Sequence, residues 1–183
     1  MNGRVKPLIG LGSWQARISV YIENRPAMQE YQLLEGLRPL QKGEIKLISD
    51  ACGNGWRKVF NVYAKLVFEL EAPRWPFQKQ ANTWQDFRDQ FLLQEDAALN
   101  LLFSVPSFET ASSTIHIVSG RTYGNKLLAE LPELAKSTHW LNSEFAISKA
   151  YNFIICPYFD YRQLSNSKIS QLVELINELG NPK

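Results

Sequence analysis

The chain has 183 residues, of which 45% are hydrophobic and 21% are charged, and its formal net charge at pH 7 is +2. This length is enough for one domain with a substantial core, and the composition is that of an ordinary globular protein. So small a net charge does not by itself indicate nucleic acid or a membrane. No segment approaches the roughly 20 apolar residues that span a bilayer. We therefore expect a single cytoplasmic domain over residues 1–183, with no membrane and with reduced cysteines.

The charge is unevenly distributed along the chain. Residues 1–79 hold 12 Lys and Arg against 7 Asp and Glu, a net +5, whereas residues 80–183 hold 8 against 11, a net −3. The weakly basic amino-terminal half either faces phosphate or carries ordinary solvated charge. Two histidines and two widely separated cysteines supply no metal-site spacing, so we expect no metal and no cofactor.

The amino-terminal third predicts a strand followed by helices. Residues 1–16 hold three glycines and one proline and are expected to form an extended lead-in. Residues 17–22 alternate apolar and polar side chains, which is typical of a strand. Pro26 suits the first turn of a helix, and apolar residues recur at helical spacing as far as Leu37. A short helix is expected over residues 44–50.

The most regular helical pattern covers residues 56–70, where apolar side chains form one stripe. Residues 72–77 contain two prolines and predict a loop. Its Trp75 and Phe77 are either exposed and free to stack on a ring, or folded back into the core. Thr83 is a suitable N-cap for the next helix.

Residues 97–104 fit either a helix or a buried strand, and their leucines favour a helix. The following segments predict, in order, a polar loop over 104–113, a strand over 138–141, a helix over 143–149, a strand over 153–156, and a last helix that begins at Ser165 or Ser167 and ends at Gly180.

The stretch TIHIVSGRTYGNKLLAEL, residues 114–131, predicts a buried strand, a short turn and a helix. Ser119, Gly120 and Arg121 lie in that turn. Free backbone N–H groups and the positive end of the helix dipole favour an anion there. The alternative is a plain connection with an arginine that faces solvent.

Three predicted strands, over 17–22, 114–118 and 153–156, are each followed by a polar turn. We expect an α/β fold in which a single domain has three layers, with helices flanking a short, mainly parallel central sheet. The three turns would then meet at one edge of the sheet, where such folds bind ligands. The candidate ligand-binding residues are Arg25, Ser119, Gly120, Arg121, Tyr158 and Arg162, and the candidate catalytic residues are Glu23, Asn24 and Asp160.

Three arginines at one edge indicate an anionic partner, because the guanidinium fork matches phosphate and carboxylate. Glu23 and Asp160 either act as acid or base, or neutralise those arginines. His116 lies within a predicted strand, which favours a core histidine, while His139 fits either role. The sequence contains no G-x-S-x-G, Walker, H-E-x-x-H or complete G-x-G-x-x-G motif, so it does not decide whether the protein is an enzyme.

The chain resembles the uracil-DNA glycosylase superfamily, in particular its mismatch-specific branch, over roughly residues 17–179. Asn24 and Pro26 are similar to the Asn-Pro turn that ends the family's first strand, with Arg25 between them. The segments that resemble the family's other motifs are Asn54-Gly55-Trp56-Arg57-Lys58-Val59, at an aromatic-basic helix start, and Cys156-Pro157 with Leu164-Ser165, at the late motif.

This resemblance implies a three-layer α/β fold in which Asn24 would position a water. Three features depart from the family. Cys156 replaces the late histidine or asparagine, the loop from Pro157 to Leu164 is longer, and the early aspartate of the main branch is missing. The resemblance therefore implies the fold, with the chemistry lost or changed.

The sequence leaves three functions open. The first is a binding domain for a phosphate-bearing partner, a nucleotide or a nucleic acid. The second is a divergent glycosylase or another hydrolase that uses Asn24, Asp160 or Glu23. The third is a protein-interaction or scaffold domain whose surface includes Trp75, Phe77 and residues 158–161. The oligomeric state is left open as well.

Overall fold

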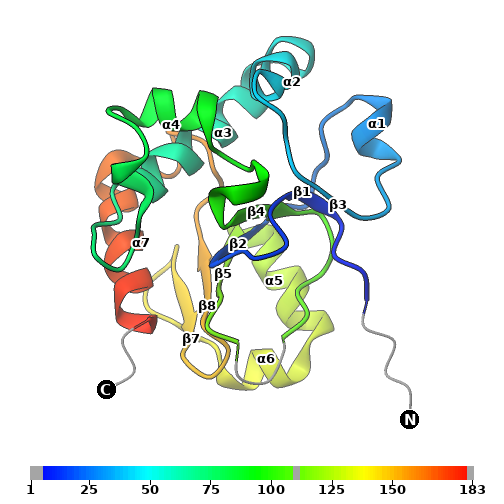
Figure 1. Cartoon of the computed structure of the whole chain (residues 1–183). Helices are drawn as coiled ribbons and strands as arrows, with labels where there is room; N and C mark the ends of the chain where they lie inside the picture. The colour runs from blue at the N-terminus through cyan, green and yellow to red at the C-terminus, as the bar shows by residue number, and fades with distance from the viewer. Residues whose placement is uncertain (1–5, 109–111, 181–183) are drawn as a thin grey trace.

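The structure, a computed structural model, describes residues 6–108 and 112–180. Strands and helices are interspersed along the chain and build one sheet with helices packed on it, which confirms the α/β class (Figure 1). The strands are β1 (Gly10–Gly12), β2 (Ile18–Tyr21), β3 (Leu37–Arg38), β4 (Leu99–Leu102), β5 (Ile115–Ser119), β6 (His139–Trp140), β7 (Ala146–Ser148) and β8 (Phe153–Cys156). The α-helices are α1 (Gln29–Gln32), α2 (Glu44–Cys52), α3 (Asn54–Phe68), α4 (Trp84–Gln90), α5 (Arg121–Glu130), α6 (Pro132–Ser137) and α7 (Asn166–Leu179). Two short 3-10 turns, Phe77–Lys79 and Glu95–Ala97, complete the described elements.

The described strands form one sheet in the order β3-β1-β4-β2-β5-β8-β7-β6. The four inner strands β4, β2, β5 and β8 run parallel. On one flank β1 is antiparallel to β4, and on the other β7 is antiparallel to both β8 and β6. The sheet is therefore mixed and eight-stranded, rather than short and mainly parallel as expected from the sequence. Both of its edge strands, β3 and β6, are two residues long.

The parallel arrangement of β2, β5 and β8 confirms the direction predicted for these three strands. Tyr21 pairs with Val118, and Ser119 pairs with Cys156, so the three carboxyl ends lie next to one another. The chain then turns into α5 after β5 and into the loop before α7 after β8. The polar turns therefore leave from one edge of the sheet, which we call the carboxyl edge.

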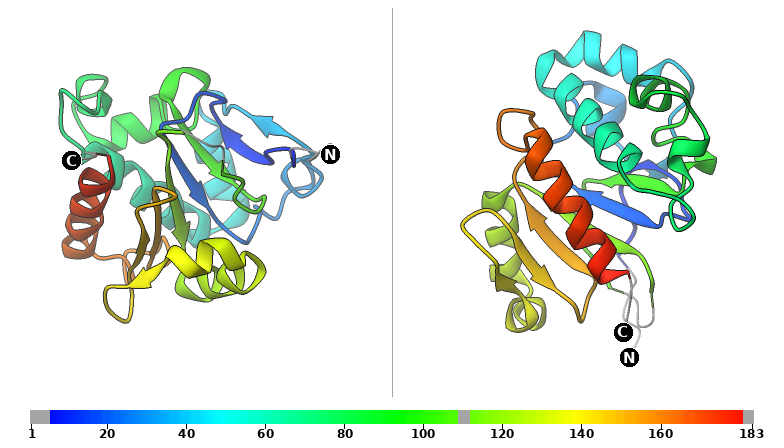
Figure 2. Two further views of the ribbon diagram at one scale, coloured as in Figure 1. Left: turned by 90° about the horizontal axis from the view of Figure 1, so that it is seen from below. Right: turned by 90° about the vertical axis from the view of Figure 1, so that its left-hand side faces the viewer.

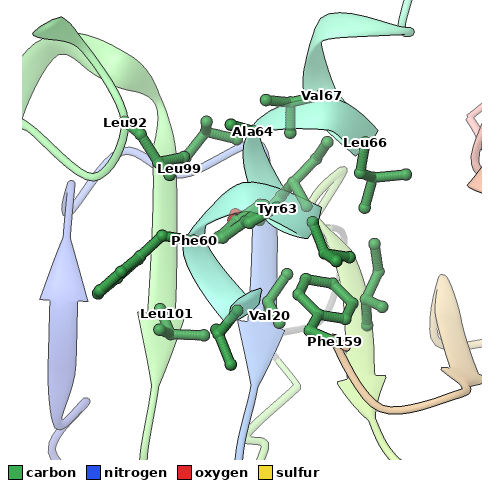
Figure 3. Packing of buried hydrophobic residues seen from close by; sticks show 14 of the residues in the cluster. Val20, Phe60, Tyr63, Ala64, Leu66, Val67, Leu92, Leu99, Leu101 and Phe159 are labelled. Carbon is green, nitrogen blue, oxygen red and sulfur yellow. The ribbon is translucent and has the colours of Figure 1, made fainter. Parts of the chain in front are cut away.

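The larger part of the core lies between the sheet and the helices α3 and α7. Figure 3 shows Phe60 and Tyr63 of α3 above Val20 of β2 and Leu101 of β4. All four side chains are fully or almost fully buried. The apolar stripe predicted over residues 56–70 is thus the face that α3 turns to the sheet, as its periodicity requires.

The helices α5 and α6 cover the opposite face of the sheet (Figures 1 and 2). A smaller cluster of buried hydrophobic residues lies between them and the sheet. It includes Val118 and Ile155 of the sheet and Leu127 of α5. A Cβ atom at Gly124 would come within 2.6 Å of the Ile155 side chain. A glycine at this position therefore lets α5 sit directly on β8.

Several predictions for the linking segments were wrong. Residues 99–102 form strand β4, because tertiary pairing with β1 and β2 outweighs the helix propensity of leucine. Part of 143–149 forms strand β7, which closes a hairpin with β8. The helix expected to reach Leu37 is only α1, after which the chain forms β3.

Of the lead-in predicted over residues 1–16, residues 1–5 lie outside the described residues, and Gly10–Gly12 form strand β1, which enters the sheet between β3 and β4. Of the loop predicted over 104–113, residues 109–111 lie outside the described residues. Trp75 and Phe77 are 2% and 0% exposed, so their loop folds back into the core. This contradicts the scaffold surface proposed around these two aromatic residues.

Other local predictions are confirmed. The Thr83 hydroxyl accepts a hydrogen bond from the Asp86 backbone N–H and so caps α4. Ser165 is the N-cap residue of α7, and Gly180 is its C-cap. Cys156 is a buried strand residue. Among the described helices, none combines the length and the apolar character that crossing a membrane requires.

Candidate functional site at the carboxyl edge

The loops that follow β2, β5 and β8 touch one another at the carboxyl edge. The Asn24 side chain, after β2, lies beside the hydroxyl of Tyr158, after β8. The Ser119 hydroxyl accepts a hydrogen bond from the Phe159 backbone N–H at 3.0 Å. The Gly120 N–H donates to the Cys156 carbonyl, also at 3.0 Å. Ser119 and Gly120 therefore hold the loop after β8 in place, a structural role within the predicted site.

An open surface hollow of about 380 Å³ lies beside this junction. We call it the strand-end hollow, and its lining includes Arg121, Glu144, Tyr158, Arg162, Gln163 and Lys168. Three of the predicted ligand-binding residues, Arg121, Tyr158 and Arg162, thus share one cavity. The lining contains three cationic side chains and one carboxylate, so its net charge is positive.

Arg121 is the first residue of α5 and is exposed. Its guanidinium lies over the ring of Trp140, with the Cζ atom 5.1 Å from the ring centroid. This cation–π contact orients the guanidinium without neutralising it. No side chain caps α5, whose N-cap is Gly120. The positive end of the helix dipole and the arginine charge therefore lie together.

Arg162 and Lys58 both bind the carboxylate of Asp160. The Arg162 Nη2 and Lys58 Nζ atoms each lie 3.2 Å from Asp160 Oδ2. Burial of the carboxyl opposes ionisation, but hydrogen bonds from the Arg162 backbone and guanidinium and from Lys58 outweigh it and lower the pKa of Asp160 to about 2. Asp160 is therefore an ion-pair partner and a poor general base, which favours the neutralising role among the two predicted for it.

Tyr158 is half-buried at the wall of the hollow. Burial and the nearby Asp160 carboxylate raise the pKa of its hydroxyl, while the Asn24 side chain lowers it. The hydroxyl therefore keeps its proton at neutral pH and is available as a hydrogen-bond donor.

Lys168, on the first turn of α7, is a lining residue that the sequence reasoning did not identify. Its Nζ atom lies 2.5 Å from Glu144 Oε1, and both side chains are partly exposed. The sequence feature that could have identified Lys168 is its position three residues after the predicted cap Ser165. The first turn of a helix lies next to the loop that precedes it. Only the fold shows that this loop is the one carrying Arg162.

Arg25 does not join the other predicted arginines. Its Nη1 atom donates to the carbonyl oxygens of Tyr31, Gln32 and Leu34 at 2.9–3.1 Å. The guanidinium therefore satisfies carbonyls at the end of α1 and is absent from the lining of the strand-end hollow. The predicted meeting of three arginines is wrong for Arg25, because unpaired helix-end carbonyls are a closer acceptor.

Glu23 is paired with a cation that was not predicted. Its Oε1 atom lies 2.6 Å from Lys126 Nζ, and both side chains are well exposed. Among the described residues, no group of three or more His, Cys, Asp and Glu side chains is placed to hold a metal ion. The two cysteines, Cys52 and Cys156, are both free thiols.

The fold and this hollow define the class of the protein: an α/β protein with a mixed sheet and a cation-lined cavity at the carboxyl edge of its parallel strands. The chain belongs to a family of unknown function, DUF6942, whose model matches residues 9–177. No curated protein and no solved structure matches it.

Proposed function

We propose that the protein binds a phosphate-bearing partner, a nucleotide or a nucleic acid, in the strand-end hollow. The observation that carries this proposal is the set of three cations, Arg121, Arg162 and Lys168, around one cavity of about 380 Å³. This volume lies within the range of small-molecule sites, roughly 300–1,000 Å³. Arg121 contributes most, because within the described residues it has an aromatic partner and no carboxylate partner.

The rest of the lining has complementary roles. Arg162 and Lys168 already contact Asp160 and Glu144, so their charges are partly offset before a ligand arrives. The Tyr158 hydroxyl supplies a neutral donor. An anion entering beside the start of α5 would meet the Arg121 guanidinium and the free N–H groups of the first helical turn.

The test is fluorescence anisotropy with three labelled probes: a nucleoside triphosphate, a single-stranded oligonucleotide and a duplex. Arg121→Ala should weaken binding about tenfold, the value of one charge-assisted hydrogen bond. Arg57→Ala is the matched control, because Arg57 is half-exposed, pairs with Asp50 and does not line the hollow. Equal affinities of the two variants, or no binding of any probe at low salt, would reject the proposal.

Salt titration then separates the partner classes. An oligonucleotide held through several phosphates loses affinity steeply with salt, whereas a nucleotide bound at one site depends on salt much less. The Lys168→Ala variant should reduce the salt slope for an oligonucleotide by about one phosphate contact. An unchanged slope would place Lys168 outside the contact surface.

A divergent glycosylase or other hydrolase is the second candidate, and the position of Asn24 favours it. Asn24 follows β2, and β2 lies between the parallel strands β4 and β5. The Asn24 side chain lies beside the Tyr158 hydroxyl. The resemblance to the uracil-DNA glycosylase superfamily assigns the water-positioning role to this residue. Release of base from uracil- and mismatch-containing duplexes, lost in Asn24→Ala, would support it, while turnover unchanged by that substitution would reject this residue.

A further inference from the structure

A second cavity lies on the face of the sheet opposite α3, over β4, β2 and β5. We call it the sheet-face pocket, and its volume is about 370 Å³. It shares no lining residue with the strand-end hollow. The residues that matter for its chemistry are Trp14, Ser19, Tyr21, Asn100, Leu102 and His116.

The floor of this pocket is a row of polar side chains at one level of the sheet. Ser19 of β2 pairs in register with Asn100 of β4 on one side and with His116 of β5 on the other. The three residues are only 5%, 2% and 7% exposed. Burying polar groups costs free energy unless they are hydrogen-bonded. The cost of burying this row therefore depends on which hydrogen bonds its three side chains make.

Internal hydrogen bonds account for only part of this row. The Tyr21 hydroxyl lies 2.8 Å from His116 Nδ1, and the Ser19 hydroxyl lies beside Tyr21. Asn100 Nδ2 donates to the Ser13 carbonyl at 3.3 Å. Among the described residues, only two buried side-chain polar atoms have no partner, and one of them is Asn100 Oδ1. This unpaired acceptor, itself shielded from solvent, thus belongs to a residue that lines the cavity.

The row offers a donor as well. Burial lowers the pKa of His116 to about 4 and raises the pKa of Tyr21, so both groups are neutral at physiological pH. A phenol is a better donor than imidazole is, and imidazole nitrogen is the better acceptor, so we assign the Tyr21 O–H as donor to Nδ1. Nε2 of His116 then carries the proton, and within the described ranges no hydrogen-bond acceptor faces it, although the ring packs edge-on against Phe108.

The remaining lining combines apolar surface with the side chains of Lys6, Ser107, Ser112 and Thr114. The Trp14 indole is 66% exposed at the rim, and Leu102 lies beside the polar row. Aromatic and aliphatic walls around a few convergent polar groups are typical of sites for small ligands. The polar row itself carries no formal charge, and Lys6, the one charged side chain among the described lining residues, is exposed, so the row favours an uncharged ligand.

We propose that the sheet-face pocket binds a small uncharged aromatic amide, whose ring contacts Trp14 and Leu102 and whose amide group exchanges hydrogen bonds with the row formed by Asn100, Ser19 and His116. An amide carries an N–H donor for the Asn100 oxygen and a carbonyl acceptor for the imidazole N–H. This inference is independent of the phosphate-binding proposal.

The test is a titration of the full-length protein, labelled with ¹⁵N, with benzamide and nicotinamide as probes and with benzoate as the charged isostere. The expected result is saturable shifts of the backbone amide signals of Ser19, Asn100 and His116 with the two amides, and weaker binding of benzoate. Tighter binding of benzoate, or no saturable shift with either amide, would overturn the proposal.

The deciding variant is Asn100→Leu, which removes the unpaired oxygen at similar side-chain size. We expect benzamide affinity to fall about tenfold, while the midpoint of thermal unfolding changes little, because removing a buried unpaired acceptor offsets the loss of the Asn100 hydrogen bond to the Ser13 carbonyl. Asn125→Leu, the same change at an exposed position of α5, is the control and should alter neither quantity. Retained affinity in Asn100→Leu would overturn the proposal.

Two further variants make the result unambiguous. If Asn100→Leu does not fold, Ser19→Ala tests the same row with a smaller change, and it should weaken benzamide binding measurably. Arg121→Ala should leave benzamide binding unchanged, because Arg121 belongs to the other cavity. Benzamide binding lost in Arg121→Ala, or kept in full in Ser19→Ala, would place the ligand elsewhere.

Discussion

The two faces of the sheet differ in what they bury. On the face toward α3 and α7, Ile18, Val20 and Ile117 are completely buried among apolar helix side chains. The other face carries the alternate residues of the same strands, which include Ser19 and His116. Both of these side chains line a cavity. Alternation along a strand allows one segment to serve both purposes. The face toward α3 and α7 therefore carries the larger apolar core, while the opposite face combines a smaller apolar cluster with polar groups.

The largest difference between the faces should appear on truncation of the helix-covered core. Phe60 is fully buried between α3 and the sheet, and Phe60→Ala should reduce the free energy of unfolding by about 3–5 kcal/mol, because it removes a large apolar side chain and leaves a void. Ser19→Ala, on the other face, should cost less than about 1 kcal/mol. Urea denaturation measures both. Similar losses would show that both faces contribute equally to the core.

The second difference concerns pH and the polar face. His116 has a pKa of about 4 in the fold against 6.5 when unfolded, because burial disfavours its charged form. The unfolded chain binds the proton first, so stability is complete above pH 6.5 and falls as the pH drops toward 4, by roughly 3 kcal/mol from this residue.

Urea denaturation between pH 7 and pH 4 measures this loss. A His116→Gln variant should lose much less stability between pH 6.5 and pH 5, where carboxyl groups contribute little. His139, the other histidine, is exposed, and His139→Gln should follow the wild-type curve. A wild-type stability that is flat across this interval would contradict the buried neutral state of His116.

The smallest effect separates the two arginines that the sequence placed together. Arg25→Ala should lower the free energy of unfolding by about 1–2 kcal/mol, because three carbonyl oxygens at the end of α1 lose their donor. It should leave the affinity for the phosphate probes unchanged. Arg121→Ala should instead weaken the binding of the phosphate probes and leave the free energy of unfolding nearly unchanged. Weaker phosphate binding in Arg25→Ala would return Arg25 to the candidate site.

The sequence predicted what depends on local pattern. The β-branched runs at 115–118 and 153–156 and the stripe of α3 correspond to the observed elements. It failed where pairing partners decide the outcome. Leucine is a good helix former, and only the neighbouring strands β1 and β2 make Leu99–Leu102 extended. Strand β7 is too short for its alternation to stand out, and the hairpin with β8 defines it.

The candidate site shows the same division. Position after a strand correctly placed Arg121, Tyr158 and Arg162 around one cavity. Periodicity does not reveal which acceptor a long side chain reaches, and for Arg25 that acceptor is its own neighbouring backbone. His116 was correctly expected in the buried part of a strand, but its row with Ser19 and Asn100 requires the register of three strands that are distant in sequence.

The two-residue strands that end the sheet have a consequence for the protein at high concentration. A foreign β segment can extend a sheet only along a sufficient number of free backbone donors and acceptors, and β3 and β6 present very few. Edge-to-edge growth into fibrils is therefore disfavoured at both borders. We expect association between copies, where it occurs, to proceed through side-chain surfaces instead.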